Sequence, residues 1–319
     1  MGNDCSRRRK KSKPPEGGAL HPRAPWDRIA GMETWIEFAK MHGAGNDFVV
    51  VADPGGLFRG GDGERLARAL CTPHTGLGSE GLIALAPESG GETDFSMVFR
   101  NPDGSRVGMC GNGARCAAFF AFRRGWAGRK TRFRSDAGTV GAEIASVGPD
   151  GASAVVRVDA TEIRDRRGRV AVTGLPGRAF RALDTGVPHA VRFVDGATED
   201  FDALDVVSEG RTVRHAPEFA PAGTNADFAR VDGPSELSLR TYERGVEDET
   251  GACGTGAIAA AVAAAESGLV SLPCRVKVRG GDMLVVDAVR GADGLCRAPT
   301  LSGPARLVCE GRFRAEWIA

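Results

Sequence analysis

The segment Cys110-Gly-Asn-Gly-Ala-Arg-Cys-Ala-Ala118 recurs later in the chain as Cys253-Gly-Thr-Gly-Ala-Ile-Ala-Ala-Ala261. Each copy opens with a cysteine, continues through Gly-x-Gly and leads into an apolar run with helical spacing. The match covers the thiol, both glycines and the alanines that let a helix pack closely. The copies lie about 140 residues apart, which indicates a twofold duplication rather than a solenoid. The sequence therefore predicts two related halves, each with a thiol at the start of a helix.

The start of a helix favours negative charge. Its unpaired N–H groups and partial positive charge lower the pKa of a thiol below the free value of about 8.5. Two such thiols on opposite sides of an anionic substrate can remove a proton from one face of a carbon and deliver one to the other face. We therefore expect Cys110 and Cys253 to act as a catalytic pair with lowered pKa values.

Composition points to an ordinary globular protein that is long enough for two domains. The chain has 319 residues, of which 42% are apolar and 26% charged. Its net charge of +1 says nothing about a partner, and we expect neither a nucleic-acid nor a membrane partner. Residues 1–31 hold eight Lys and Arg against three Asp and Glu. Such a run can be a nucleic-acid patch or an import signal, but we interpret it as a disordered tail. With neither a secretory signal nor a stretch of about 18 apolar residues, we expect a cytoplasmic protein.

The cysteines predict reduced thiols rather than a metal site or a disulfide scaffold. None of the eight forms a CxxC pair, whereas zinc ligands usually lie about two to four residues apart. Five of the other cysteines are expected to be buried or half-buried packing residues. These are Cys71, Cys116, Cys274, Cys296 and Cys309.

Strands outnumber helices in the predicted elements. Strands are expected at 35–40, 48–51, 81–86, 95–100, 132–134, 140–145, 154–158, 190–194, 228–231, 237–241, 275–278, 284–289 and 305–314, and helices at 63–70, 111–124 and 255–267. The last two helices are apolar nearly all round, so they must be buried, as strands wrapped about a central helix would allow. We expect a tail at 1–31, an N-terminal half at 32–155, a C-terminal half at 156–304, and a closing strand at 305–319 that joins the first half.

Polar residues near the glycine loops suit an amino-acid ligand. The loops alone are weak evidence, because they are also typical of tight turns and phosphate sites, but neither continues into the Lys-Ser/Thr of a nucleotide loop. Asn46, Asn101 and Asn225 can donate and accept hydrogen bonds, and Arg244 can bind a carboxylate through two. His189 follows a proline that fixes its direction, which favours an acid/base role.

Several blocks in this order resemble the diaminopimelate epimerase family, from about residue 35 to the C-terminus. They are Met41-His-Gly-Ala-Gly-Asn-Asp-Phe48, Asn101-Pro-Asp-Gly-Ser105, Met109-Cys-Gly-Asn-Gly-Ala-Arg-Cys116, Pro221-Ala-Gly-Thr-Asn225, Glu243-Arg-Gly-Val246 and Ala252-Cys-Gly-Thr-Gly-Ala257. The resemblance implies an α/β (α+β) fold of two pseudo-symmetric domains, each a sheet or barrel around a buried helix, with the active site in the cleft between them. It also implies a homodimer.

The reaction implied by the resemblance interconverts LL- and meso-diaminopimelate, for lysine and peptidoglycan precursors, with neither pyridoxal phosphate nor a metal. Matched residue by residue, Cys110 and Cys253 are the catalytic thiols. His189 and Glu243 are the residues that set their protonation states. The residues implied to bind substrate are Asn46, Asn101, Asn225, Glu243 and Arg244, with Gly111, Asn112, Gly254 and Thr255 as the backbone cradle of the reacting carboxylate.

Two departures from the family's pattern stand out. Many members have Asn where this chain has Val187, and the loop Val246-Glu-Asp-Glu-Thr-Gly251 is one residue longer than in some relatives. The departure at Val187 concerns how the distal end of the substrate is bound.

Two other functions remain open from the residues alone. A relative of proline racemase would share the two-thiol plan, although that family shows His at the place of Asn112 and lacks the block around Asn46. A non-catalytic module could use the two glycine loops to hold a small anion, but the presence of both cysteines argues against it.

Overall fold

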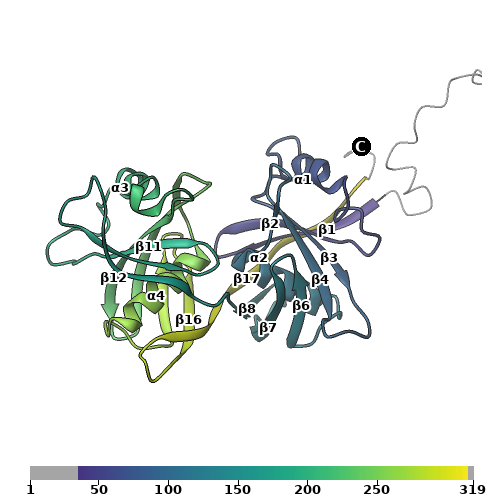
Figure 1. Ribbon diagram of the computed structural model, residues 1–319. Helices are drawn as coiled ribbons and strands as arrows, with labels where there is room; N and C mark the ends of the chain where they lie inside the picture. The colour runs from purple at the N-terminus through teal and green to yellow at the C-terminus, as the bar shows by residue number, and fades with distance from the viewer. Residues whose placement is uncertain (1–34, 315–319) are drawn as a thin grey trace, which may run out of the picture.

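The computed structural model describes residues 35–314. The predicted tail at 1–31 lies outside the described residues, as do the last five residues of the chain. Figure 1 shows two halves side by side, each built of strands around a helix.

The strands are β1 (Trp35–Gly43), β2 (Asn46–Ala52), β3 (Leu82–Pro87), β4 (Phe95–Arg100), β5 (Arg106–Val107), β6 (Lys130–Ser135), β7 (Gly138–Val147), β8 (Ser153–Asp159), β9 (Arg164–Ala171), β10 (Ala179–Asp184), β11 (Pro188–Phe193), β12 (Asn225–Gly233), β13 (Glu236–Glu243), β14 (Asp248–Thr250), β15 (Cys274–Val278), β16 (Met283–Arg290) and β17 (Cys296–Arg314). The α-helices are α1 (Gly63–Cys71), α2 (Gly111–Arg123), α3 (Val206–Arg214) and α4 (Gly254–Glu266), and Pro217–Phe219 forms a short 3-10 helix.

The first half is a closed barrel. Its strands pair in the order β17–β1–β2–β3–β4–β6–β7–β8, and β8 pairs with β17 again. The pairs β2–β3 and β4–β6 are parallel, and the others are antiparallel. Parallel neighbours need a crossover connection, which α1 and α2 provide.

The second half repeats this order strand by strand. β10, β11, β12, β13, β15, β16 and β17 take the places of β1, β2, β3, β4, β6, β7 and β8. The parallel pairs are now β11–β12 and β13–β15, connected through α3 and α4. The duplication predicted from the two cysteine segments therefore extends to the order and direction of these seven strands.

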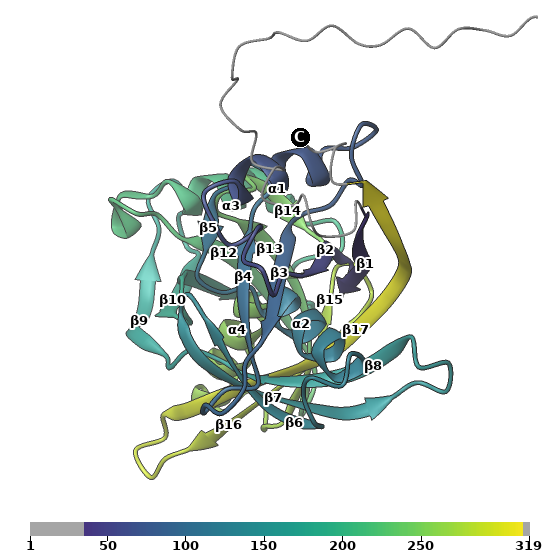
Figure 2. The ribbon, with the colours of Figure 1, turned by 90° about the vertical axis from the view of Figure 1, so that its right-hand side faces the viewer.

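The apolar run in the middle of β2 shows how the core is divided. Phe48 and Val50 point inward to α2, whereas Val49 and Val51 point outward to α1. Alternation along a strand places successive side chains on opposite faces, and helices cover both faces here. Figure 2 shows α2 enclosed by the strands of the first half.

The central helices are buried, as predicted. Every α4 residue from Gly256 to Ala265 is buried, and the two helices share one apolar core. α4 is almost uniformly apolar, so only a site with strands on all sides removes its surface from water.

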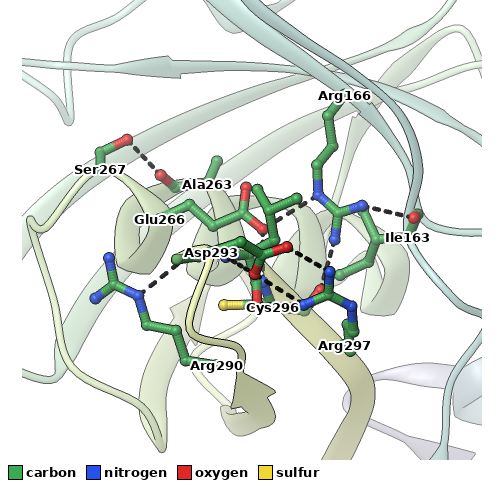
Figure 3. A network of polar contacts seen from close by, with 11 residues as sticks. Ile163, Arg166, Ala263, Glu266, Ser267, Arg290, Asp293, Cys296 and Arg297 are labelled. Carbon is green, nitrogen blue, oxygen red and sulfur yellow. Dashed lines mark hydrogen bonds and ion pairs between the residues drawn. The ribbon is translucent and has the colours of Figure 1, made fainter.

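The halves are joined where β17 crosses from one to the other beside β8 (Figure 2). In Figure 3, Arg166 donates to Glu266 Oε1 (3.1 Å) and to the carbonyl of Cys296 (2.5 Å), while the Cys296 N–H donates to the same carboxylate oxygen (2.9 Å). Glu266 is the last residue of α4. The C-terminal end of the helix that starts at Cys253 is thereby tied to both β9 and β17.

The predicted strands correspond to observed ones, but the prediction missed β5, β9, β10, β14, α3 and the short 3-10 helix. β9 reads Arg-Asp-Arg-Arg-Gly-Arg-Val-Ala and is largely exposed, so no apolar alternation marks it. α3 contains a glycine, and polar residues interrupt its apolar positions, so no clear helical pattern marks it. The predicted strand 305–314 is the second part of β17, which begins at Cys296. Residue 155 lies inside β8, and the domain boundaries stay predictions.

Among the packing cysteines, Cys71, Cys116, Cys274 and Cys296 are buried as predicted, but the prediction for Cys309 was wrong because it lies exposed on β17. None of the helices in residues 35–314 is long and apolar enough to cross a membrane.

Candidate active site

Each repeated cysteine caps the helix that follows it. Cys110 and Cys253 have extended backbone conformations, and their Sγ atoms accept the N–H of Gly113 (3.5 Å) and Gly256 (3.4 Å). Side chains of Ser, Thr or Asp usually occupy this position and satisfy one of the free N–H groups of the first turn. A thiol in their place is held at the helix start with its sulfur against the backbone donors.

The two helix starts meet around Leu301 of β17. A Cβ on Gly111 would lie 3.6 Å from Leu301 Cδ2, and one on Gly254 would lie 3.0 Å from the same atom. A Cβ on Gly254 would also lie 3.9 Å from Asn112 Oδ1. The predicted cradle residues Gly111, Asn112 and Gly254 are therefore brought together.

Asparagine side chains surround the first thiol. Cys110 Sγ lies 3.7 Å from Asn46 Oδ1, which also accepts a hydrogen bond from Asn112 Nδ2 (3.4 Å). The amide nitrogen of Asn46 donates to the Glu80 carboxylate, which fixes the amide with its oxygen toward the thiol. Asn112 is itself held by buried Arg115, whose guanidinium donates to Asn112 Oδ1 (2.7 Å).

A carboxyl group accompanies the second thiol. Glu243, at the end of β13, forms a hydrogen bond with the Cys253 side chain and accepts one from Thr250 Oγ1 (2.6 Å). Thr255 Oγ1 lies 3.4 Å from Cys253 Sγ. Glu243 also acts electrostatically on Cys110, so its charge is felt at both thiols.

His189 belongs to the same cluster. Its Nε2 lies 3.0 Å from Thr255 Oγ1, and its Nδ1 lies 2.6 Å from Asp227 Oδ2. The parallel pairing of β11 with β12 places His189 directly beside Asn225. Asn225 accepts the backbone N–H of Arg244 (2.8 Å) and donates to the carbonyl of Pro188 (2.9 Å).

Asn101 is not joined to this cluster by a hydrogen bond within residues 35–314. It lies in the turn after β4, where its amide donates to Ser105 Oγ (3.1 Å). Arg244 contributes its backbone to the cluster, while its guanidinium donates to the carbonyl of Ala222 (3.3 Å).

The expected low thiol pKa values were wrong for the substrate-free site. Burial raises the pKa of Cys110, and it raises that of Cys253 well above the usual value, with Glu243 and Asp227 adding to the rise at Cys253. The helix N–H groups lower both pKa values, as the sequence argument predicts, but removal from water has the larger effect. Burial therefore favours the thiol form of both groups, and one must lose a proton before it can act as a base.

Two acidic residues of the site were not recognised from the sequence. Asp227 follows Asn225 by two positions in a strand, so both project from the same face, and this alternation of polar residues in an apolar strand was the available signal. Glu80 lies in a glycine-rich loop before β3, and nothing in its neighbourhood distinguishes it from an ordinary loop residue.

The comparisons with known proteins follow this geometry. The family model described as diaminopimelate epimerase matches residues 38–163 and 181–298. The chain is 40% identical to the diaminopimelate epimerase of Chlorobaculum tepidum, over 85% of this chain and 98% of that protein. It is 38% identical to the one of Aquifex aeolicus, over 88% and 99%.

Solved structures share the fold at lower identity. A probable proline racemase from Agrobacterium radiobacter K84 has a TM-score of 0.63 at 17% identity and covers 88% of this chain and 93% of its own. A phenazine biosynthesis protein of the PhzF family from Bacillus anthracis has a TM-score of 0.66 at 15% identity, with 88% and 99% covered. These likenesses concern the fold alone.

Proposed function

This chain belongs to the diaminopimelate epimerase family, and we propose that it inverts one α-carbon of diaminopimelate by proton transfer between Cys110 and Cys253. The observation that carries the proposal is the pair of capping thiols, each at the start of a repeated helix, with both helix starts against Leu301. A duplicated fold gives one acid/base group from each half, as inversion at carbon requires.

In the proposed reaction, one cysteine as thiolate removes the α-proton, so that a C–H bond breaks and an S–H bond forms. The other cysteine, as thiol, gives its proton to the opposite face of the carbon and becomes the thiolate. The reverse reaction exchanges the two roles. Negative charge that develops on the reacting carboxylate is stabilised by the N–H groups at the two helix starts, near Gly111, Asn112, Gly254 and Thr255.

The remaining site residues are proposed to hold the substrate and to set the protonation of the thiols. Asn46 and Asn112 lie at the first thiol, and Asn225 lies beside His189. Arg244 is proposed to bind the distal carboxylate with its guanidinium. Asn101 is proposed to form a hydrogen bond with the substrate when substrate is bound. Glu243 is proposed to influence the protonation of Cys253 through its negative charge, which raises the pKa of that thiol.

The test is epimerisation of LL-diaminopimelate by the purified protein, in the presence of a chelator and of a carbonyl reagent that inactivates pyridoxal phosphate. Formation of the meso isomer, with incorporation of solvent deuterium at the inverted carbon, is the expected result. Lysine and proline serve as substrates in parallel. Turnover of proline with no turnover of diaminopimelate would contradict the proposal.

We further propose that the protein acts as a homodimer in the cytoplasm, in the synthesis of lysine and peptidoglycan precursors. All seven cysteines in residues 35–314 are unpaired, which is typical of a reducing compartment. Light scattering of the purified protein tests the dimer, and fractionation of the cells that make it tests the compartment.

A further inference from the structure

A chain of hydrogen-bonding groups, a hydroxyl followed by an imidazole, leads away from the Cys253 thiol. It runs from Cys253 Sγ to Thr255 Oγ1 (3.4 Å), from Thr255 Oγ1 to His189 Nε2 (3.0 Å), and from His189 Nδ1 to Asp227 Oδ2 (2.6 Å). The side chains of His189 and Asp227 are fully buried. Water therefore does not compete for the contact between His189 and Asp227.

The tautomer of His189 decides the direction of the hydrogen bonds in this chain. Asp227 accepts a hydrogen bond from Thr241 Oγ1 on its other oxygen (2.8 Å), so its carboxylate is held in place against His189. With Nδ1–H donated to Asp227, the histidine presents the lone pair of Nε2 to Thr255. The Thr255 hydroxyl then donates to His189 and offers its own lone pair to the Cys253 thiol.

The first half differs, because Cys110 lies next to the amide of Asn46, which donates to Glu80 and has no hydroxyl or imidazole to pass on a proton. Gly113 and Gly256 occupy the same position in α2 and α4, two residues after the first glycine of each motif. A Cβ on Gly256 would meet Asp227 Oδ1 at 2.5 Å, whereas one on Gly113 would meet Ile83 Cδ1 at 3.2 Å. An apolar side chain thus lies under the first helix where a buried carboxylate lies under the second.

We propose that Asp227, His189 and Thr255 form a proton relay that deprotonates Cys253, and that Cys253 is the thiolate and Cys110 the thiol in the form of the protein that this relay produces. This inference rests on the proposed two-thiol reaction and deepens it. In the relay, the S–H bond breaks as Thr255 gains the proton, and the hydroxyl proton of Thr255 moves to His189 Nε2. The products are a thiolate and an imidazolium paired with Asp227.

If Asp227 acted only through its charge, it would decrease the amount of Cys253 thiolate rather than increase it. The titratable groups around Cys253 are Glu243, Asp227 and His189, and the negative charges of Glu243 and Asp227 raise the pKa of the thiol. Removal of the Asp227 charge would then increase the amount of thiolate if Asp227 were only a nearby anion. If Asp227 anchors the relay, its removal decreases the amount of thiolate, so the sign of the change separates the two cases.

The experiment measures alkylation of each cysteine by iodoacetamide near pH 8, in the full-length protein without substrate, with peptide mass spectrometry as the readout. Asp227→Asn and Thr255→Val are expected to slow the modification of Cys253 by about fivefold or more, because the thiolate is the reactive form. Thr255→Ser keeps the hydroxyl and is expected to stay within about twofold of the wild type. Cys110 in the same samples is expected to change by less than about twofold, since no relay reaches it.

Matched controls come from buried side chains outside the hydrogen-bonded cluster at the thiols. Thr131→Val removes a buried hydroxyl that donates to Asp94 Oδ2, and Asp53→Asn alters a buried carboxylate that accepts the N–H groups of Phe58 and Arg59. Both are expected to leave the alkylation of Cys253 unchanged. Thr255→Val keeps the test informative if Asp227→Asn fails to fold by circular dichroism.

Faster alkylation of Cys253 in Asp227→Asn, or an unchanged rate in Thr255→Val, would overturn the relay. So would equal slowing of Cys110 and Cys253, which indicates a general structural effect. The wild-type protein is assayed for epimerisation separately. Absence of that activity would refute the proposed function, while the alkylation rates still decide whether the relay exists.

Discussion

Gly256 lies directly against Asp227, so that a Cβ on this glycine would be 2.5 Å from Asp227 Oδ1 and 3.1 Å from Thr241 Oγ1. The third residue of helix α4 therefore has to be glycine for the buried carboxylate to keep its place under the helix start. The equivalent Gly113 has a flexible neighbour, the end of the Ile83 side chain.

Gly256→Ala is accordingly expected to lower the free energy of unfolding by about 1–3 kcal/mol and to reduce epimerisation at least tenfold, because overpacking must displace Asp227 or the helix start. Gly113→Ala is expected to have the smaller effect on both, since Ile83 can change its rotamer. Chemical denaturation and initial rates check the pair. Equal losses in the two variants would contradict this account.

Serine at either catalytic position is expected to reduce epimerisation by about three orders of magnitude or more, because an alcohol is too weakly acidic to replace a thiol on either face of the carbon. Cys309→Ser is the matched control, since Cys309 is exposed on β17. Circular dichroism verifies that Cys110→Ser and Cys253→Ser remain folded. Activity near the wild-type level in either of them would exclude the two-base reaction.

Glu243 is expected to cost stability at neutral pH. Burial raises the pKa of its carboxyl above the usual value of 4.5, so the folded state binds the proton more tightly than the unfolded state does. Its contribution to stability is then present below pH 4.5 and is lost as the pH rises through the folded pKa.

Glu243→Gln keeps an oxygen for the Thr250 hydroxyl but cannot become charged. It is expected to raise the melting temperature at neutral pH by roughly 2–4 °C, which corresponds to about 1 kcal/mol, and to lose this advantage near pH 4. Epimerisation is expected to fall in the same variant. A lower melting temperature at neutral pH, or a difference that does not vary with pH, would show that the ionised carboxylate is well compensated.

Val187 is expected to have little influence on substrate choice. An asparagine at this position would add one hydrogen bond, worth about 0.5–1.5 kcal/mol, whereas a bidentate contact from Arg244 to a carboxylate is stronger. Val187→Asn is therefore expected to change KM for diaminopimelate by less than about tenfold. Measurement of kcat/KM for diaminopimelate and lysine decides it, and equal turnover of lysine would show that the distal carboxylate is not recognised.

The sequence by itself determined the duplication, the two capping cysteines and the burial of both central helices. These features are local: a Cys-Gly-x-Gly start and an apolar run specify a helix, its cap and its environment within about fifteen residues. The same locality explains why β9 was missed, since an arginine-rich, exposed edge strand is defined by its pairing with β10 and by no pattern of its own.

Tertiary structure alone decided the protonation of the site. The N–H groups of a helix start predict a low thiol pKa, but the pKa of Cys253 is raised because the folded chain removes the thiol from water and brings Glu243 and Asp227 close to it. The contact of His189 with Asp227 depends on the parallel register of β11 and β12. Desolvation and long-range charge depend on which segments meet in space, so no pattern along the chain could reveal which of two nearly identical thiols is joined to a buried carboxylate.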